Sequence, residues 1–268
     1  NIAGTDYAAT VDNSGNWTLA LDAATLQDLA SGVLPLVVTA TDAAGNVGTV
    51  ENAVSVDYGA PTLTLNAVAG DNTLNAAETL QDLVISGTAS QSEVGQTVVV
   101  NFNGQTLQTV VLNGGSWRVT VPASTLQTLP DGDTPVSVTL TDAAGNVTTI
   151  DRPIAVVANP SDLPTLTLDA IATDGYLSQA EAGQALTLSG SSSDLQSGQT
   201  VTVTLNGASF TGTVGDDGAW RVTVPQTAVA QLEDGVQNII VSAADTAGNP
   251  ASVEGSFTVV AGAASQPT

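Results

Sequence analysis

Alternating apolar and polar residues run in short segments through most of the chain. The segment 135–141, for example, reads PVSVTLT, with aliphatic side chains at every second position of its later part. Such a period of two is typical of β-strands that bury one face, and Gly, Asn, Asp or Pro bounds each segment, as expected for turns. Between residues 61 and 160 the pattern predicts seven strands: 62–68, 83–88, 97–103, 106–112, 116–121, 135–141 and 147–157.

Turn signals and one short helical pattern complete this picture. NG at 103–104 and GG at 114–115 indicate hairpins. ASTLQTL at 123–129, echoed by AATLQDL at 23–29, predicts a single helical turn, and the stretch 71–80 allows another. Seven short strands in about a hundred residues is the number expected for an immunoglobulin-like sandwich. The predicted fold is therefore all-β.

Internal repeats decide the organisation of the chain. DAAGN stands at 42–46 and 142–146, and DTAGN at 245–249. Trp17, Trp117 and Trp220 are 100 and 103 residues apart, the same two spacings as the Asp residues of these motifs. PTLTL at 61–65 and 164–168 is again 103 residues apart. Repetition at a fixed period predicts tandem immunoglobulin-like modules stacked end to end as a rod.

The repeat boundaries define the expected domains. Residues 1–57 align only with the second half of a repeat, 58–160 and 161–262 are complete repeats, and 263–268 open a linker to a next one. We expect the first 57 residues to begin in mid-module, with the missing strands supplied by a preceding segment or by something else. The linkers at 57–60 and 158–163 are short and run into Pro, whose fixed φ stiffens a joint.

Composition excludes several classes of function. The chain carries 26 acidic residues against three Arg, has a formal net charge of −23, and contains no His or Cys. Nucleic acids and anionic lipid surfaces bind through Lys and Arg, so neither is an expected partner, and no apolar run is long enough to insert into a membrane. Without His, Lys or Cys, most nucleophile–base pairs are absent, and serial identical copies are unusual for catalytic sites, so we expect no enzyme activity.

The sandwich topology predicts where the acidic loops lie. The loop between the last two strands is at the N-terminal end of such a domain, so DAAGN at 142–146 should face the preceding module. The segments 70–78 and 129–133 should face the following one. Carboxylates gathered there repel one another unless they are hydrated, protonated or bridged by a cation. Calcium accepts six to eight oxygen ligands in flexible geometry and is the expected ion. The residues expected around the second junction are Asp71, Glu78, Asp131, Asp133, Asp162 and Asp245.

Each motif also has a purely structural interpretation. Gly145 and Asn146 suit a positive φ, and Asp142 can cap its own turn. Asp71 and Glu78 can cap a helical turn, and an acidic surface can serve solubility alone. The three Trp residues open a strand after Gly and a small residue; exposed, they would be a platform for sugars, but their identical place in every repeat favours a buried core position.

DxAGN before the last strand, GxW at the fifth strand, APTLTL after Asp57 and the DN…E segment of Asp71, Asn72 and Glu78 together resemble the bacterial Ig-like repeats of giant surface adhesins exported by type I secretion. These include biofilm-associated proteins of the BapA type and the Salmonella adhesin SiiE. The resemblance covers nearly the whole chain and implies stalks whose junctions are rigidified by calcium. The metal ligands it implies are Asp57, Asp71, Glu78, Asp142, Asp174, Glu181 and Asp245.

Repeat three departs from this pattern in two places. It has Asp174-Gly175 where repeat two has Asp71-Asn72, and its preceding linker is longer, with Asp162 displaced relative to Asp57. Both differences predict a second junction that binds calcium differently from the first.

The sequence thus predicts an extracellular, cell-surface stalk segment of an adhesin, with neighbouring repeats as its partners and host-surface or biofilm-matrix components as further ones. One alternative is a module that binds a carbohydrate or protein, for which Tyr176 and Phe210 are the candidates. Another is homotypic cell–cell association through an uncharged edge such as TVVVNFNG at 97–104. The ice-binding role of some related adhesins requires regular Thr arrays, which the sequence lacks.

Overall fold

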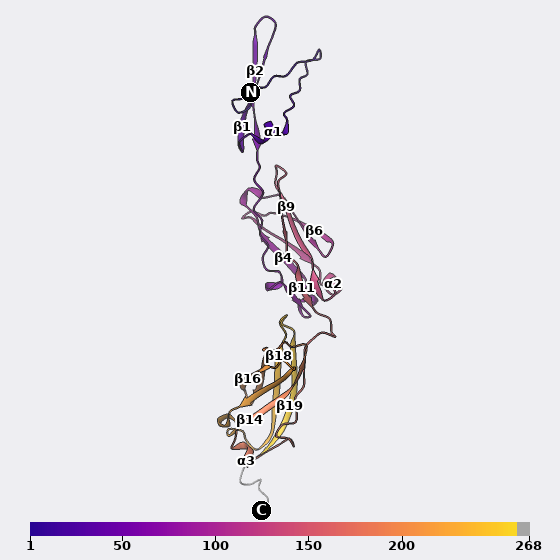
Figure 1. Cartoon of the computed structure of the whole chain (residues 1–268), viewed down its shortest axis with the longest axis vertical. Helices are drawn as coiled ribbons and strands as arrows, with labels where there is room; N and C mark the ends of the chain where they lie inside the picture. The colour runs from indigo at the N-terminus through magenta and orange to yellow at the C-terminus, as the bar shows by residue number, and fades with distance from the viewer. Residues whose placement is uncertain (262–268) are drawn as a thin grey trace, which may run out of the picture.

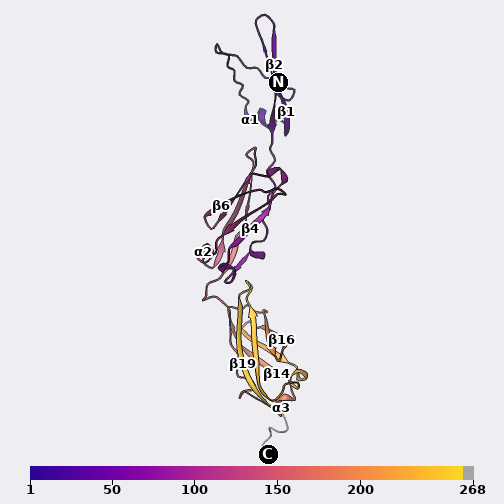
Figure 2. The ribbon, with the colours of Figure 1, turned by 180° about the vertical axis from the view of Figure 1, so that it is seen from behind.

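The chain forms three units in a line, with the N-terminus at one end and the C-terminal unit at the other (Figures 1 and 2). The structure is a computed structural model and describes residues 1–261. We use the names first, second and third module for residues 1–57, 58–160 and 161–261. Two separate hydrophobic cores occupy the second and third modules. The second and third modules are thus tandem all-β, immunoglobulin-like sandwiches, as the sequence predicts.

The second module consists of short strands joined by single helical turns. Its elements are η1 (Val68–Gly70), β3 (Thr73–Asn75), η2 (Glu78–Leu80), β4 (Leu83–Thr88), η3 (Gln91–Glu93), β5 (Thr97–Phe102), β6 (Gln105–Val110), β7 (Ser116–Val121), α2 (Ala123–Leu126), β8 (Gly132–Thr134), β9 (Val136–Thr141), β10 (Val147–Asp151) and β11 (Ile154–Val157). The sheet β10-β9-β5-β6 faces the pair β4-β7, and the small sheet β3-β11-β8 lies at the end toward the third module.

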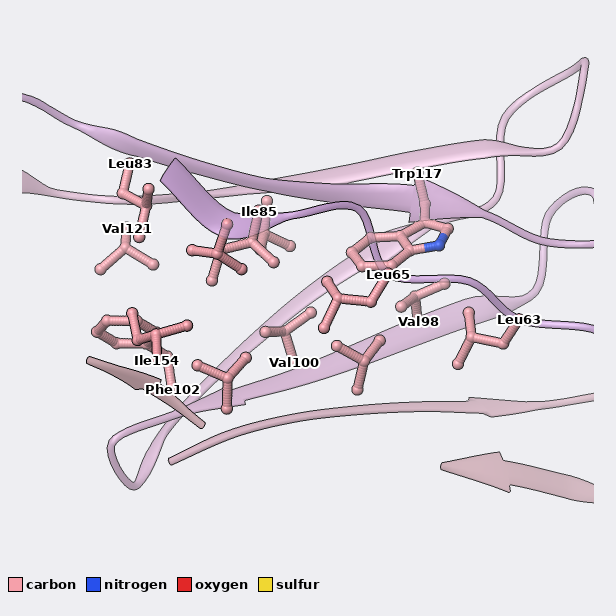
Figure 3. Close-up of a cluster of buried hydrophobic side chains, with 14 of the residues drawn as sticks. Leu63, Leu65, Leu83, Ile85, Val98, Val100, Phe102, Trp117, Val121 and Ile154 are labelled. Carbon is pink, nitrogen blue, oxygen red and sulfur yellow. The ribbon is translucent and has the colours of Figure 1, made fainter. Parts of the chain in front are cut away.

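The core of the second module follows from the alternation in its strands. Val98, Val100 and Phe102 of β5 are fully buried, and Val99 and Asn101 between them are not. Figure 3 shows the indole of Trp117 pointing into the core, toward Ile85. The indole fits because Gly87 lies opposite it: a Cβ at Gly87 would stand 2.6 Å from Trp117 Cζ2 and 1.9 Å from the Thr64 carbonyl oxygen. A Gly is therefore required beneath the tryptophan.

The third module repeats this plan with longer strands. Its elements are β12 (Thr165–Leu166), β13 (Tyr176–Ser178), α3 (Gln179–Ala182), β14 (Leu186–Ser193), β15 (Thr200–Leu205), β16 (Ala208–Val214), β17 (Ala219–Val224), α4 (Gln226–Val229), β18 (Gly235–Ala244) and β19 (Pro250–Val260). Pairing of β16 with β17 joins them into one eight-stranded sheet, β12-β14-β17-β16-β15-β18-β19-β13. Gly190 lies against Trp220 as Gly87 lies against Trp117, with a virtual Cβ 2.7 Å from Cζ2.

The first module contains α1 (Ala23–Gln27), β1 (Gly32–Thr41) and β2 (Val47–Val56), and β1 and β2 form a two-stranded sheet. Asp22 caps α1 by accepting a hydrogen bond from Thr25 N at 2.8 Å. Trp17 is 47 % exposed, whereas Trp117 and Trp220 are each 1 % exposed. The prediction of a buried core tryptophan is therefore confirmed for the second and third modules and wrong for the first, because no second layer among residues 1–261 covers Trp17.

Most predicted strands of the second module are confirmed, and two are corrected. Segment 62–68 is no regular strand. Thr64 N and Asn66 N donate to carbonyls of β4, but Thr88 N donates to the Thr64 hydroxyl instead of its carbonyl, so the reciprocal ladder bond is missing there. Segment 147–157 is divided at Pro153, which has no N–H for the ladder, so β10 pairs with β9 whereas β11 turns to β3 and β8. The helical turn is confirmed at α1 and α2.

The predicted homotypic edge is also corrected. TVVVNFNG contains β5, which is hydrogen-bonded to β6 on one side and β9 on the other. Its backbone groups are used within the sheet, so this segment offers no free edge to a second chain.

Candidate functional site: the junctions between modules

The DxAGN motif folds into the same tight turn in all three modules. Asp142 Oδ1 accepts hydrogen bonds from Ala144 N at 2.9 Å and Asn146 N at 2.8 Å, and Asn146 Nδ2 donates to Asp142 Oδ2 at 2.9 Å. Gly145 adopts a φ of +95°. Asn146 is not among the residues of positive φ, so its predicted backbone role is wrong, and its side chain is what the turn uses.

This hydrogen bonding holds the turn carboxylate in its charged form. The side-chain bond from Asn146 lowers the pKa of Asp142 below its usual value of 3.8, with further lowering from the main-chain N–H groups of the turn, while desolvation acts in the opposite direction. Asn46 lowers the pKa of Asp42 in the same way. The turn therefore presents an ionised aspartate that is already bonded through both carboxylate oxygens.

The asparagine of the motif also contacts the neighbouring module. Asn146 Nδ2 donates to the carbonyl oxygen of Asp57 in the first linker at 3.1 Å. Asn249 Nδ2 likewise donates to the carbonyl oxygen of Val157, just before the second linker, at 2.9 Å. Asn249 is buried, whereas Asn46, whose turn lies at the end of the first module away from the second, is exposed. The turn thus lies at the junction that the topology predicts, and its Asn binds the incoming chain.

The two junctions differ in what else they contact. At the second, Asn249 Oδ1 accepts a hydrogen bond from Ala76 N at 2.8 Å, so the turn of the third module bonds directly to the lower end of the second. At the first, Thr148 Oγ1 donates to Pro61 O at 2.6 Å, and the Tyr58 hydroxyl donates to Leu26 O at the end of α1. The first junction is therefore held through its linker, and the second through a direct contact between modules.

The other predicted ligands form local caps, each through one carboxylate oxygen. Asp131 Oδ1 accepts from Ala158 N and Asn159 N at 2.9 Å and so fixes the start of the second linker. The remaining bonds are Asp57 Oδ1 from Gly59 N at 2.9 Å, Asp71 Oδ1 from Thr73 N at 2.8 Å, Glu78 Oε2 from Asn75 N at 3.0 Å, Asp162 Oδ1 from Ser161 Oγ at 3.0 Å, Asp174 Oδ1 from Tyr176 N at 2.9 Å and Glu181 Oε2 from Ser178 N at 2.9 Å.

Acidic residues lie in pairs at the ends of the modules. The hydrogen bonds from Ser178 lower the pKa of Glu181, and the nearby charge of Asp174 partly opposes them. Asp71 and Glu78 hold the equivalent places in the second module, on either side of β3. Within residues 1–261, however, no group of three or more acidic side chains is gathered closely enough to hold a metal ion. The oxygen-only donors suit calcium in chemistry, and calcium binding by these residues stays a prediction.

The sequence did not identify Asn146 and Asn249 as junction residues. The sequence did contain a sign of this role, because the Asn recurs at a fixed offset from the Asp in every copy of the motif. The turn needs the Gly for its positive φ and the Asp for its cap, whereas the Asn side chain does more than close the turn, because it also bonds to the preceding module.

Comparison with known proteins finds that this chain is similar to domains of bacterial adhesins. No family model and no curated protein matches the chain. A structure of a 1.5-MDa bacterial ice-binding adhesin is 30 % identical over 96 % of this chain and 84 % of its own, with a TM-score of 0.45. A Ca²⁺-stabilised adhesin of an Antarctic bacterium is 32 % identical over 96 % of this chain and 63 % of its own, with a TM-score of 0.44. An immunoglobulin-like domain of the M. primoryensis ice-binding adhesin is 35 % identical over 37 % of this chain and 98 % of its own, with a TM-score of 0.29.

These three solved structures, to which the chain is similar, come from bacterial adhesins. Helices of the described part of the chain are few and short, and none could cross a membrane.

Proposed function

We propose that the chain is a non-catalytic extender segment in the stalk of a large bacterial surface adhesin, of the biofilm-associated, type I-secreted kind that its motifs resemble. The observation that carries this proposal is the direct contact at the second junction, where Asn249 bonds to Val157 and Ala76 together. Two modules held by a buried side chain between two separate backbone segments cannot swing freely. A row of such junctions spaces an adhesive tip away from the cell surface.

Calcium is the second part of the proposal. Asp71 and Glu78 lie on the second module's end toward the third, next to Asn75 and Ala76, which flank the turn at 245–249. A calcium ion there would supply positive charge against the repulsion of these carboxylates and add oxygen–metal bonds to the junction. Extracellular modules bind calcium with a Kd of about 10⁻⁴ to 10⁻³ M, so export would precede binding. The remaining predicted ligands, Asp57, Asp131, Asp142, Asp162 and Asp245, belong to the same junctions.

Small-angle scattering in millimolar calcium and in excess chelator tests this function. We expect the maximum dimension of the chain to vary over a narrower range in calcium than in chelator. The isosteric pair Asp71→Asn with Glu78→Gln keeps an oxygen acceptor for Thr73 N and Asn75 N but removes both charges, and should abolish the response between the second and third modules.

The matched control is Asp174→Asn with Glu181→Gln, the equivalent pair at the far end of the third module. It should leave the calcium response of the second junction intact. Scattering curves that superimpose with and without calcium would contradict a role for calcium and mean that hydrogen bonds alone stiffen the stalk. Equal effects of the two variant pairs would contradict the proposed position of the ion.

The alternative of a ligand-binding module gains little from the structure. Tyr176 is exposed, but Phe210 packs against the core of the third module, so the two do not form an aromatic platform. Host-surface and biofilm-matrix components remain partners proposed for the adhesin as a whole.

A further inference from the structure

The strand β6 ends the four-stranded sheet of the second module, and only one of its edges is paired. It is hydrogen-bonded to β5, and within residues 1–261 no strand pairs with its other edge. Just beyond β6, Val111 N donates to Gln96 O at 3.0 Å, so the odd-numbered residues of β6 bond to β5. The N–H and C=O groups of Thr106, Gln108 and Val110 therefore point toward the unpaired edge. In Figures 1 and 2 β6 lies at the side of the second module.

The third module does not leave this edge open. There Thr213 of β16 pairs with Arg221 of β17, and β16 lies inside the eight-stranded sheet. Gly212 makes the approach possible, because a Cβ at this position would stand 2.0 Å from the Arg221 carbonyl oxygen. Thr109 holds the equivalent position in β6, 103 residues earlier, and its Cβ excludes the same approach to β7. The open edge of the second module thus follows from its own sequence.

Exposed apolar side chains lie at one end of this edge. Val94 is 36 % exposed, Val110 44 % and Leu112 48 %, and a hydrogen bond from Gly95 N to Val111 O at 2.8 Å joins the two segments that carry them. The third module has polar or small residues at the three equivalent positions: Ser197, Thr213 and Gly215. The second module therefore adds apolar surface at the place where its sister module closes the sheet.

The edge also lacks charge. No Asp, Glu, Lys or Arg lies between Glu93 and Arg118, and β6 contains no Pro. Native proteins commonly block an exposed edge strand with a charged side chain, a Pro or a bulge, because its free N–H and C=O groups accept another strand. With a net charge of −23, the chain repels a second copy of itself over most of its surface. At β6 two copies can approach without opposing charges of their own strands.

We propose that β6 is an interface at which two copies of this chain pair edge to edge, antiparallel, about a two-fold axis at Gln108. In this register the two Gln108 side chains face each other and can exchange hydrogen bonds, since an amide is both donor and acceptor. Thr106 lies opposite Val110 of the second copy, and the backbone groups of all three residues find partners. An interface on a two-fold axis requires this kind of self-complementarity.

The proposed pairing fixes the relative direction of the two chains. The strands of this sheet run along the length of the module, because β9 ends at the 142–146 turn by the first junction and begins at the opposite end, next to β8. Antiparallel pairing of β6 therefore places the two rows of modules in opposite directions, as for chains that extend from facing surfaces. The pairing itself does not rest on calcium or on the proposed stalk function.

Sedimentation equilibrium of the whole chain at low and high salt tests this interface. We expect a monomer–dimer equilibrium that strengthens with salt, because salt screens the repulsion between the acidic surfaces and leaves the uncharged edge unaffected. Gln108→Glu places like charges opposite each other and should weaken the dimer several-fold, as should Gln108→Lys. An equimolar mixture of these two variants should restore association. The matched control is Thr211→Glu, which adds the same charge at the equivalent position of β16 and should leave the dimer unchanged.

Single cysteines report the register, because the chain contains no Cys of its own. Under oxidising conditions Gln108→Cys should form a disulfide between two copies, and Thr106→Cys should link to Val110→Cys in preference to itself. A chain that stays monomeric in high salt up to its solubility limit overturns the proposal and leaves the edge for a strand of another protein. Dimerisation that Gln108→Glu does not weaken also overturns it, since the interface would then lie elsewhere.

Discussion

Asn249 Nδ2 donates a hydrogen bond to the carbonyl oxygen of Val157, 92 residues earlier in the chain, at 2.9 Å. The same amide group donates to Asp245 Oδ2 at 2.8 Å, so one side chain closes a turn of the third module and fixes the end of the second. Asn146 repeats both bonds at the first junction. Turn formation and module packing are therefore linked through a single residue type.

Asn249→Ala should loosen the second junction. It removes the donor to Val157 O and the acceptor for Ala76 N, and losing such buried bonds costs about 1–3 kcal/mol each before relaxation. We expect a broader range of distances between spin labels on the second and third modules, together with a lower melting temperature of the third. Asn46→Ala is the control, because it breaks the same turn bond to Asp42, and Asn46 makes no hydrogen bond to another module of the described chain. Equal loosening by both variants would place the effect in the turn rather than in the junction.

The Gly beneath each core tryptophan should be irreplaceable. At Gly87 a Cβ would lie 1.9 Å from Thr64 O, a backbone atom that cannot yield without displacing the segment along β4. Overpacking of this kind costs about 1–3 kcal/mol and sometimes more, so Gly87→Val should destabilise the second module by at least about 3 kcal/mol. Gly190→Val should do the same to the third, as read from separate transitions in urea.

Gly48→Val is the matched control for these variants. Gly48 also lies in a strand, but nothing stands within 4 Å of its virtual Cβ. The substitution should change stability little. A tolerated valine at Gly87 would show that the packing of Trp117 in solution differs from that described.

The sequence predicts the fold of these modules well because its repeats are aligned and its strands alternate. β4 and β7 begin and end where the pattern places them, since each buries one face against the same core. The division of 147–157 depends on which strands accept β10 and β11, and the exposure of Trp17 depends on a second layer that the described residues do not supply. Both are properties of tertiary pairing, which a local pattern does not contain.

The candidate site was predicted less completely. Topology alone places the DxAGN turns at the junctions. The sequence cannot show, however, that the carboxylates of Asp142 and Asp131 are occupied by N–H groups of their own loops, because capping and metal binding require the same residue types at the same spacing. Calcium binding by these residues therefore remains a prediction.

Acid should weaken the turn at Asp142. Because its pKa in the folded chain lies below the usual 3.8, the carboxylate contributes stability that is fully present above about pH 4 and is lost as the pH falls through the lower, folded-state value. Asp142→Asn should therefore be less stable than the parent chain at neutral pH, with the difference shrinking below pH 4. Asn146→Ala removes the largest cause of the shift, so the pKa of Asp142 followed by carboxyl ¹³C NMR should rise. An unchanged pKa would refute this assignment.

The two core tryptophans should differ in how well they tolerate phenylalanine. Trp220 Nε1 donates to Thr167 O at 3.1 Å, whereas Trp117 Nε1 is buried with no hydrogen-bond partner among the described residues. Both rings lie over a Gly and are equally buried, so the loss of ring volume is matched. An unpaired buried N–H is unfavourable, and a satisfied one contributes about 1 kcal/mol. We expect Trp220→Phe to destabilise the third module by about 1 kcal/mol more than Trp117→Phe destabilises the second, as measured by calorimetry of each module's transition. Equal losses would mean that the indole N–H of Trp117 finds a partner in solution.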